Sequence, residues 1–239
     1  MQKIICYLKK AVPWLLPYTC ILCHGHSTRS QDLCDDCFAD LPHLLYACPR
    51  CANPLANEHS LTCGFCLKQK ISFDATFALF SYQAPITKLI MNLKFGQSLV
   101  NARILGELLA QNIQEKWYYN NPLPEIIIPM PLHTQRLQER GFNQAIEIAR
   151  PIAKKLFLPM EIDACKRIKQ TAAQATLPAR QRLHNIRNAF HIPETIPYKY
   201  VAVIDDVITT GHTMNEFCHT LKQAGVQRID VWCCARSNF

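Results

Sequence analysis

The sequence predicts an α/β protein in which helices flank a mostly parallel sheet, with a small cysteine-rich module in front. From Phe73 onward, short apolar runs alternate with amphipathic helical stretches, the pattern of strand–helix–strand units. Before that point, eight of the thirteen cysteines fall in four CxxC pairs. We therefore expect a metal-binding module over residues 1–70 and a larger domain over residues 71–239.

The elements of the larger domain follow from the spacing of its apolar residues. Residues 73–82 alternate apolar and polar side chains, as a half-buried strand does, whereas residues 100–117 repeat apolar side chains at helical spacing. The predicted strands are 73–82, 125–130, 160–167, 200–205 and 228–235. The predicted helices are 85–94, 100–117, 142–156 and 212–224.

The four CxxC pairs predict two structural zinc ions. Two pairs complete a tetrahedral Cys₄ site with no open position for a reactant. Pairing in chain order assigns Cys20, Cys23, Cys34 and Cys37 to one ion and Cys48, Cys51, Cys63 and Cys66 to the other. A crossed pairing and a rubredoxin-like iron are the alternatives. Disulfides would need an oxidising compartment, which nothing in the sequence indicates.

The positive charge of the chain is concentrated in one stretch. The net charge is +8, and residues 133–187 hold eleven Lys and Arg against four acidic residues. This excess suits a phosphorylated substrate or nucleic acid, and a solvated basic face is the alternative. No apolar run approaches the roughly 18 residues of a membrane span. The N-terminal stretch is broken by Lys9, Lys10 and Pro13, which predicts a local helix or docking segment in a cytoplasmic protein.

Residues 201–213, VAVIDDVITTGHT, have the chemistry of a phosphate site at the end of a parallel strand. In open α/β sheets, ligands bind beyond the carboxyl ends of the strands. The turn after the apolar run leads into a helix N-terminus, where backbone N–H groups and the helix dipole attract anions. Gly211 permits a left-handed conformation there. Asp205 and Asp206 stand one step upstream, within reach of sugar hydroxyls or of Mg²⁺.

The same segment resembles the signature of type I phosphoribosyltransferases for phosphoribosyl pyrophosphate (PRPP). The resemblance implies that Asp205 and Asp206 hold the ribose hydroxyls of PRPP bound with Mg²⁺. It also implies a 5′-phosphate site, for which the candidates are Val207, Thr209, Thr210, Gly211, His212 and Thr213. Val207 and Ile208 depart from the Met/Leu or Ala/Ile found in some members, at positions that serve packing.

Two further segments match features that this family implies. The loop that grips pyrophosphate corresponds to residues 129–133, with Pro131 and Leu132 at its centre. The flexible loop that closes over PRPP corresponds to residues 169–182, for which an ordinary exposed loop is the alternative. Arg136 and Arg140 are candidates for neutralising pyrophosphate. The candidate catalytic residues are Asp205, Asp206 and Arg140.

The chain as a whole resembles the ComF family of competence proteins. The resemblance rests on the eight cysteines, the segment 93–96 (LKFG), the string from Arg136 to Gln144, residues 185–190 and the PRPP signature. It implies a double zinc ribbon before a type I phosphoribosyltransferase fold, and a role in natural transformation through handling of internalised single-stranded DNA. Other competence and DNA-processing proteins are candidate partners.

Three functions are compatible with these features. The first is phosphoribosyl transfer to an acceptor that the sequence does not identify. The second is binding of PRPP without turnover, as a sensor, since a fold does not fix a function. The third is binding of single-stranded DNA by the zinc module and the basic stretch, with PRPP as a modulator.

Overall fold

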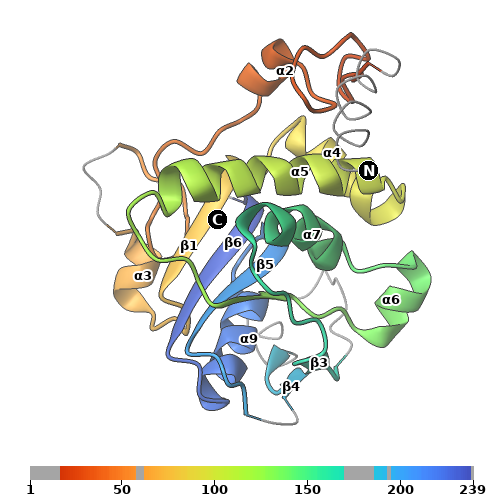
Figure 1. Ribbon diagram of the computed structural model, residues 1–239. Helices are drawn as coiled ribbons and strands as arrows, with labels where there is room; N and C mark the ends of the chain where they lie inside the picture. Colours follow the sequence, from red (N-terminus) through yellow and green to blue (C-terminus); the bar gives the residue numbers. More distant parts are fainter. Residues whose placement is uncertain (1–16, 58–61, 170–185, 193–194, 238–239) are drawn as a thin grey trace. The chain divides into compact units, whose positions relative to one another are not determined.

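A computed structural model describes most of the 239-residue chain (Figure 1), namely residues 17–57, 62–169, 186–192 and 195–237. These residues form two compact units, which divide between Pro42 and His43. The predicted N-terminal segment before Pro17 and the predicted loop beyond Lys169 lie outside the described residues. Among the described residues, no helix has the length and apolar character needed to cross a membrane.

The first unit has little apolar material with which to form a core. Its described part holds one short helix, α2 (Asp35–Ala39). The apolar side chains of Leu33 and Leu41, which flank this helix, are buried. The Ser27 hydroxyl donates a 3.0 Å hydrogen bond to the Leu33 carbonyl. A segment of this size needs metal ligation to hold one conformation.

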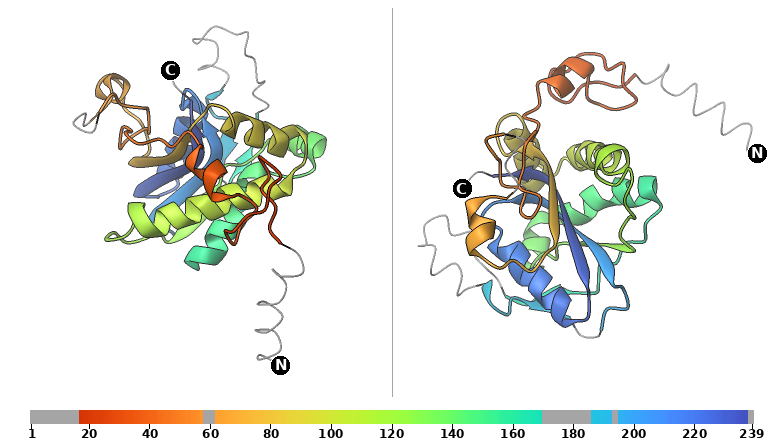
Figure 2. Two further views of the ribbon diagram at one scale, coloured as in Figure 1. Left: turned by 90° about the horizontal axis from the view of Figure 1, so that it is seen from above. Right: turned by 90° about the vertical axis from the view of Figure 1, so that its left-hand side faces the viewer.

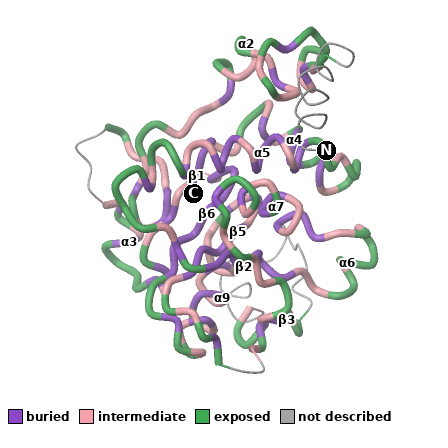
Figure 3. The backbone as a smooth tube through the Cα atoms, in the orientation of Figure 1, coloured by how far each residue is buried: buried purple, intermediate pink, exposed green. Residues whose placement is uncertain are grey.

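The larger unit is built on a four-stranded parallel sheet in the order β1-β6-β5-β2 (Figure 1). The strands are β1 (Ala75–Ser81), β2 (Ile126–Pro129), β5 (Tyr200–Ile208) and β6 (Arg228–Arg236). The two central strands are buried along almost their whole length (Figure 3). Parallel strands covered on both faces read as continuous apolar runs, which explains the sequence pattern of β5.

Helices cover both faces of this sheet (Figure 2). On one side are α5 and α7, preceded by α4, and on the other is α9. The bounds are α4 (Ile86–Phe95), α5 (Leu99–Asn112), α7 (Gln144–Leu156) and α9 (His212–Gln223). The alternation of strand and helix read from the sequence is therefore confirmed.

The structure differs from the predicted elements in three places. The helix predicted over 100–117 changes at Ile113 into a π-helical turn, η1 (Ile113–Trp117). This turn is followed by Tyr118, whose hydroxyl donates to the buried Asp230 carboxylate at 2.6 Å. The other two places hold short helices that were not predicted: α2 and α3 (Gly64–Lys68) at the zinc ligands Cys37 and Cys66, and α6 (Thr134–Arg140) after β2.

The strand predicted over 160–167 is wrong for most of its length. Only Lys166–Arg167 (β3) forms a strand, and it pairs with Phe190–His191 (β4) in a separate antiparallel ribbon. Met160 forms a single bridge to Ile127. Between them, the Glu161 carboxylate accepts a 2.8 Å bond from the backbone N–H of Asp163. This local side-chain contact competes with the ladder and ends it.

The contact between α5 and α7 depends on Gly106. A methyl group at this position would lie 2.3 Å from the Ile148 carbonyl oxygen and 2.5 Å from a side-chain carbon of Pro151. We expect Gly106→Ala to lower the free energy of unfolding by about 1–3 kcal/mol, the usual cost of overpacking, in denaturant titrations. Gly64→Ala is the matched control, because nothing lies within 4 Å of the added methyl. Equal stability of the two variants would contradict this account.

Candidate functional site

Both cysteine groups have the geometry of a zinc site. In each group, all four sulfur atoms lie within 4.8 Å of one another. The Cys23–Cys34 and Cys51–Cys63 sulfur atoms are 3.7 Å and 3.4 Å apart. Tetrahedral zinc with bonds of about 2.3 Å separates its sulfur ligands by roughly 3.8 Å. The predicted pairing in chain order is confirmed, and the residues fit Zn²⁺ with no position left open for catalysis.

The two zinc sites differ in their surroundings. In the first unit, Cys20 is buried but Cys23 is exposed, and the other two ligands are half-buried. In the second site all four cysteines are buried. They belong to the same buried cluster as apolar residues of β5, β6 and α9. The second site is therefore part of the core of the larger unit.

The acidic pair lies in the part of β5 that extends beyond the end of its neighbour β2. The β2–β5 pairing ends at Pro129–Ile204, and the Met130 N–H donates to the Ile204 carbonyl at 2.8 Å. Beyond this point, within the part of the chain that the structure describes, β5 pairs with β6 alone, through Ile208. The predicted end of the strand at Asp205 is therefore corrected, because Asp205 and Asp206 lie within the strand at an edge that β2 leaves open. The chain leaves β2 and β5 toward opposite faces, which is the topology of a ligand-binding crevice.

The two acids have different electrostatic environments. Asp206 is 3% exposed and forms an ion pair with the Lys94 ammonium group at the end of α4. Burial lowers the pKa of Lys94, but attraction to Asp206 outweighs it and the pKa is raised. Burial, followed by the charge of Asp206, raises the pKa of Asp205 well above its ordinary value, and Lys94 opposes this shift. Of the two acids, Asp206 forms the ion pair and Asp205 has the raised pKa.

The predicted phosphate-binding residues form the turn between β5 and α9. Val207 is still in the strand, Thr209 and Thr210 form the turn, and Gly211 is the N-cap of α9 with φ of +77°. The left-handed conformation expected of Gly211 is confirmed. The first turn of α9 begins at His212, so the N–H groups that a helix cannot pair within itself lie at the end of the turn. Thr213 is the second residue of this helix.

The predicted pyrophosphate segment leads from β2 into α6. This segment runs from Pro129 to the start of α6, and in it Pro131 is buried and Leu132 is half-buried. Asn143 caps α7 by accepting from the Ala145 N–H at 2.9 Å, and its amide donates to the Met130 carbonyl at 3.0 Å. Asn143 therefore holds the chain that leaves β2.

Arginine side chains gather around the acids. Arg140 donates to the Gln144 side chain and lies 5.7 Å from the ring centre of Phe95, which is 70% exposed. Burial lowers the pKa of Arg140, while the charge of Asp206 opposes this and that of Arg136 adds to it. Arg167 has its pKa lowered by burial and then by Arg136, and Asp205 opposes.

The structure adds two cations that sequence reasoning did not place in the site, Lys94 and Arg167. Lys94 lies in the LKFG segment, whose resemblance was the one signal for it, and nothing in the sequence singled out Arg167. Lys94 pairs with Asp206 directly, the charges of the two acids act on Arg140 and Arg167, and the charge of Arg136 acts on both of these arginines. Such a site can bind an anion of several charges while the acids contact hydroxyl groups.

Two family models match this chain. A double zinc ribbon domain matches residues 11–67, and a phosphoribosyl transferase domain matches residues 143–238. Competence protein F of Haemophilus influenzae is 36% identical over 225 residues, covering 92% of this chain and 97% of that protein. The chain belongs to the ComF family. The resemblance drawn from the sequence is confirmed, and so is the type I phosphoribosyltransferase fold with an N-terminal zinc ribbon module.

Other ComF relatives extend over nearly the same length. DNA utilization protein YhgH of Salmonella typhi is 31% identical, covering 93% of this chain and 98% of that protein. Competence protein ComFC of Streptococcus pneumoniae is 21% identical, covering 87% and 90%.

Solved structures also share similarity with this chain. Glutamine PRPP amidotransferase from B. subtilis matches with a TM-score of 0.36 and 19% identity, covering 55% of this chain and 25% of that chain. Purine phosphoribosyltransferase from Pyrococcus horikoshii matches with a TM-score of 0.31 and 17% identity, covering 67% and 77%.

The unequal environments of the acids predict opposite effects on stability. A raised pKa means that ionised Asp205 opposes folding, a cost that is absent below the ordinary carboxyl pKa of about 4 and appears as the pH rises through the folded value. Asp205→Asn should therefore raise the melting temperature at neutral pH, by roughly 2–4 °C per kcal/mol, and the gain should vanish near pH 4.

Asp206→Asn is the matched control with the opposite sign. It leaves the Lys94 ammonium group partly buried without its partner, which should destabilise the protein by about 1–3 kcal/mol at neutral pH. Melting temperatures of both variants and the wild type, measured from pH 4 to pH 8, test this. Equal shifts of one sign would show that the acids share one environment.

Proposed function

We propose that this ComF-family chain binds PRPP with Mg²⁺ at the open edge of β5 and transfers its phosphoribosyl group. The observation that carries the proposal is an acidic pair on β5, joined to Lys94 by an ion pair and followed directly by the turn into the N-terminus of α9; the charges of the acids also act on Arg140 and Arg167. A sugar bearing a monophosphate at one end and a diphosphate at the other needs hydroxyl acceptors between two anion sites. The functional division we propose is a zinc module over residues 1–70 and a phosphoribosyltransferase domain over residues 71–239.

Each part of the site has a distinct task in this proposal. Asp205 and Asp206 accept hydrogen bonds from the ribose hydroxyls. Backbone N–H groups and hydroxyls of residues 209–213 hold the 5′-phosphate. The Pro131–Leu132 backbone, Arg136 and Arg140 hold pyrophosphate, and Arg167 adds positive charge to their side of the site. Mg²⁺ bound with PRPP would supply positive charge beside the pyrophosphate.

The reaction breaks the bond between the ribose C1 and pyrophosphate. Positive charge develops on the ribose ring, and the arginines stabilise the charge that accumulates on the departing pyrophosphate. A nucleophile of the acceptor then forms a bond to C1. The relatives are named competence protein F and DNA utilization protein, which supports a role in DNA uptake during natural transformation, with DNA as the acceptor or as a modulator. We place this role in the cytoplasm.

PRPP binding tests the site directly. We expect the wild type to bind PRPP with Mg²⁺ in calorimetry, and Asp205→Asn and Asp206→Asn each to weaken binding at least tenfold, since a hydrogen bond to a charged group contributes about 1.5–3 kcal/mol. Asp163→Asn removes an exposed carboxylate of the same kind and should leave the affinity unchanged. Full affinity in both site variants would contradict the assignment.

Turnover separates a transferase from a sensor. Release of pyrophosphate from PRPP in the presence of nucleobases, nucleotides or single-stranded DNA would establish transfer and reveal the acceptor class. Binding of PRPP with no release under any of these conditions would establish the non-catalytic alternative, a PRPP-sensing factor of competence.

Single-stranded DNA is a second candidate ligand, favoured by the exposed charge of the basic stretch. Arg150, Lys154 and Lys155 are exposed in and near the last turns of α7. We expect binding to a single strand to weaken with salt, and Lys154→Glu/Lys155→Glu to reduce the slope of the logarithm of affinity against that of salt by about 0.7 per lost contact. Lys116→Glu, at an exposed lysine of η1, is the control. Binding indifferent to salt and to these changes would exclude this surface.

A further inference from the structure

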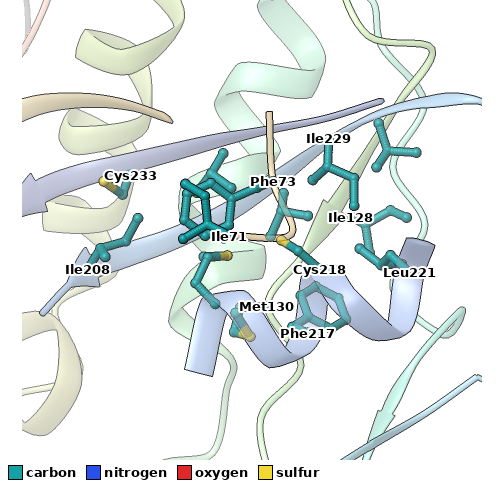
Figure 4. Packing of buried hydrophobic residues seen from close by; sticks show 14 of the residues in the cluster. Ile71, Phe73, Ile128, Met130, Ile208, Phe217, Cys218, Leu221, Ile229 and Cys233 are labelled. Carbon is teal, nitrogen blue, oxygen red and sulfur yellow. The ribbon is translucent and has the colours of Figure 1, made fainter. Parts of the chain in front are cut away.

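The second zinc site lies directly behind the predicted phosphate loop. We call residues 209–213 the phosphate loop and the described residues of 48–72 the knuckle segment. A hollow between them is lined by Cys51 and Phe65 on one side and by Thr210, Gly211 and His212 on the other. Figure 4 shows Ile71 and Phe73 packed in the same cluster as Ile208 and Cys218. The zinc ligands therefore pack in one cluster with Ile208, the residue before the phosphate loop, and the hollow lies between them and the loop.

Arg236, the last residue of β6, links the two by hydrogen bonds. It is 1% exposed, and its Nε donates to the Cys51 carbonyl at 2.9 Å. Its Nη1 donates to the Ile208 carbonyl at 2.8 Å and also contacts the Thr209 carbonyl. A guanidinium is planar, so the directions of its donors are fixed relative to one another. One rigid group thus holds the backbone of a zinc ligand beside the backbone that begins the phosphate loop.

A second link holds the other end of the phosphate loop. Asn215, in the first turn of α9, accepts a 2.7 Å bond from the Ser72 N–H at the end of the knuckle segment. On its far side the knuckle segment is attached to β1, because Thr76 donates from its hydroxyl to the Arg50 carbonyl at 2.8 Å. The loop is therefore held before Thr210 and after Thr213 by a segment whose own conformation depends on zinc.

We infer that Arg236 is a positioning residue through which the second zinc site, Cys48, Cys51, Cys63 and Cys66, fixes the phosphate loop for the 5′-phosphate. This inference rests on the proposed function. It assigns the two zinc ions different roles, since the four ligands of the first site belong to the other unit. The second ion supports binding of the monophosphate end of PRPP, and the pyrophosphate end depends on other residues, Arg136 and Arg140.

The test compares ligands that occupy different ends of the site. Ribose 5-phosphate, PRPP and pyrophosphate, each with Mg²⁺, are titrated against the wild type, Arg236→Gln and Arg236→Lys. We expect Arg236→Gln to weaken ribose 5-phosphate and PRPP by the same factor, about tenfold or more, and Arg236→Lys to restore part of the affinity. Pyrophosphate affinity and a zinc content of two ions should not change. Arg228→Gln, at the opposite end of the same strand, is the matched control.

A loss of affinity for all three ligands, or for none, would overturn the inference, because general destabilisation does not distinguish the two ends of PRPP. A wild type that binds neither ribose 5-phosphate nor PRPP would instead refute the proposed function, and the inference with it. Binding by the wild type together with unchanged affinities in Arg236→Gln refutes the inference alone.

The zinc sites supply a second arm that does not depend on Arg236. Cys37→Ser removes a ligand of the first site and Cys66→Ser a ligand of the second. Zinc content and melting temperature are measured beside the affinity for ribose 5-phosphate. Cys37→Ser should lose one zinc and keep its affinity, whereas Cys66→Ser should lose one zinc and at least tenfold in affinity, or fail to fold. Equal affinities in two folded variants that have each lost one zinc would overturn the inference.

Discussion

The site depends on a mismatch in strand length. β2 has four residues, whereas β5 and β6 have nine each, so among the described strands the end of β5 has a neighbour on one side alone. Backbone and side chains along that open edge can meet a ligand without breaking a ladder. The acidic pair, the phosphate loop and the start of α6 all lie beyond the end of β2. A longer β2 would fill the space that the ligand needs.

Alternation along β5 gives the two acids different partners. Successive side chains of a strand point to opposite faces, so Asp205 and Asp206 cannot share one environment. Asp206 follows Ala202 and Ile204 toward the helices that include α4, and there it finds Lys94. No cation of the described residues forms such an ion pair with Asp205, and its pKa is raised by burial and by its neighbour. Ionised Asp205 destabilises the unliganded protein, and a bound cation or hydroxyl group would stabilise its charge.

The sequence predicted the parts of the site that are local in the chain. The four CxxC pairs predict metal ligands, the apolar run of β5 predicts a buried strand, and the glycine of the phosphate loop predicts a left-handed turn. Each pattern lies within a few residues of sequence. Lys94, Arg167 and Arg236 act through contacts with residues far away in the chain, and no short-range pattern reports such contacts. The failed strand at 160–167 has the reverse cause, since a local contact of Glu161 overrides an apolar pattern that suggested a ladder.

Arg236 also joins the second zinc site to the core of the larger unit. A guanidinium at 1% exposure needs acceptors for its donors, and Arg236 finds them at Cys51, at Ile208 where β5 ends, and at Thr209. Irregular backbone supplies free carbonyls, and the knuckle at Cys51 and the turn at Thr209 are both irregular. Zinc allows such a backbone to be rigid without being regular. Bound zinc would thus fix one acceptor of a buried cation, the Cys51 carbonyl, and that cation also contacts the backbone that begins the phosphate loop.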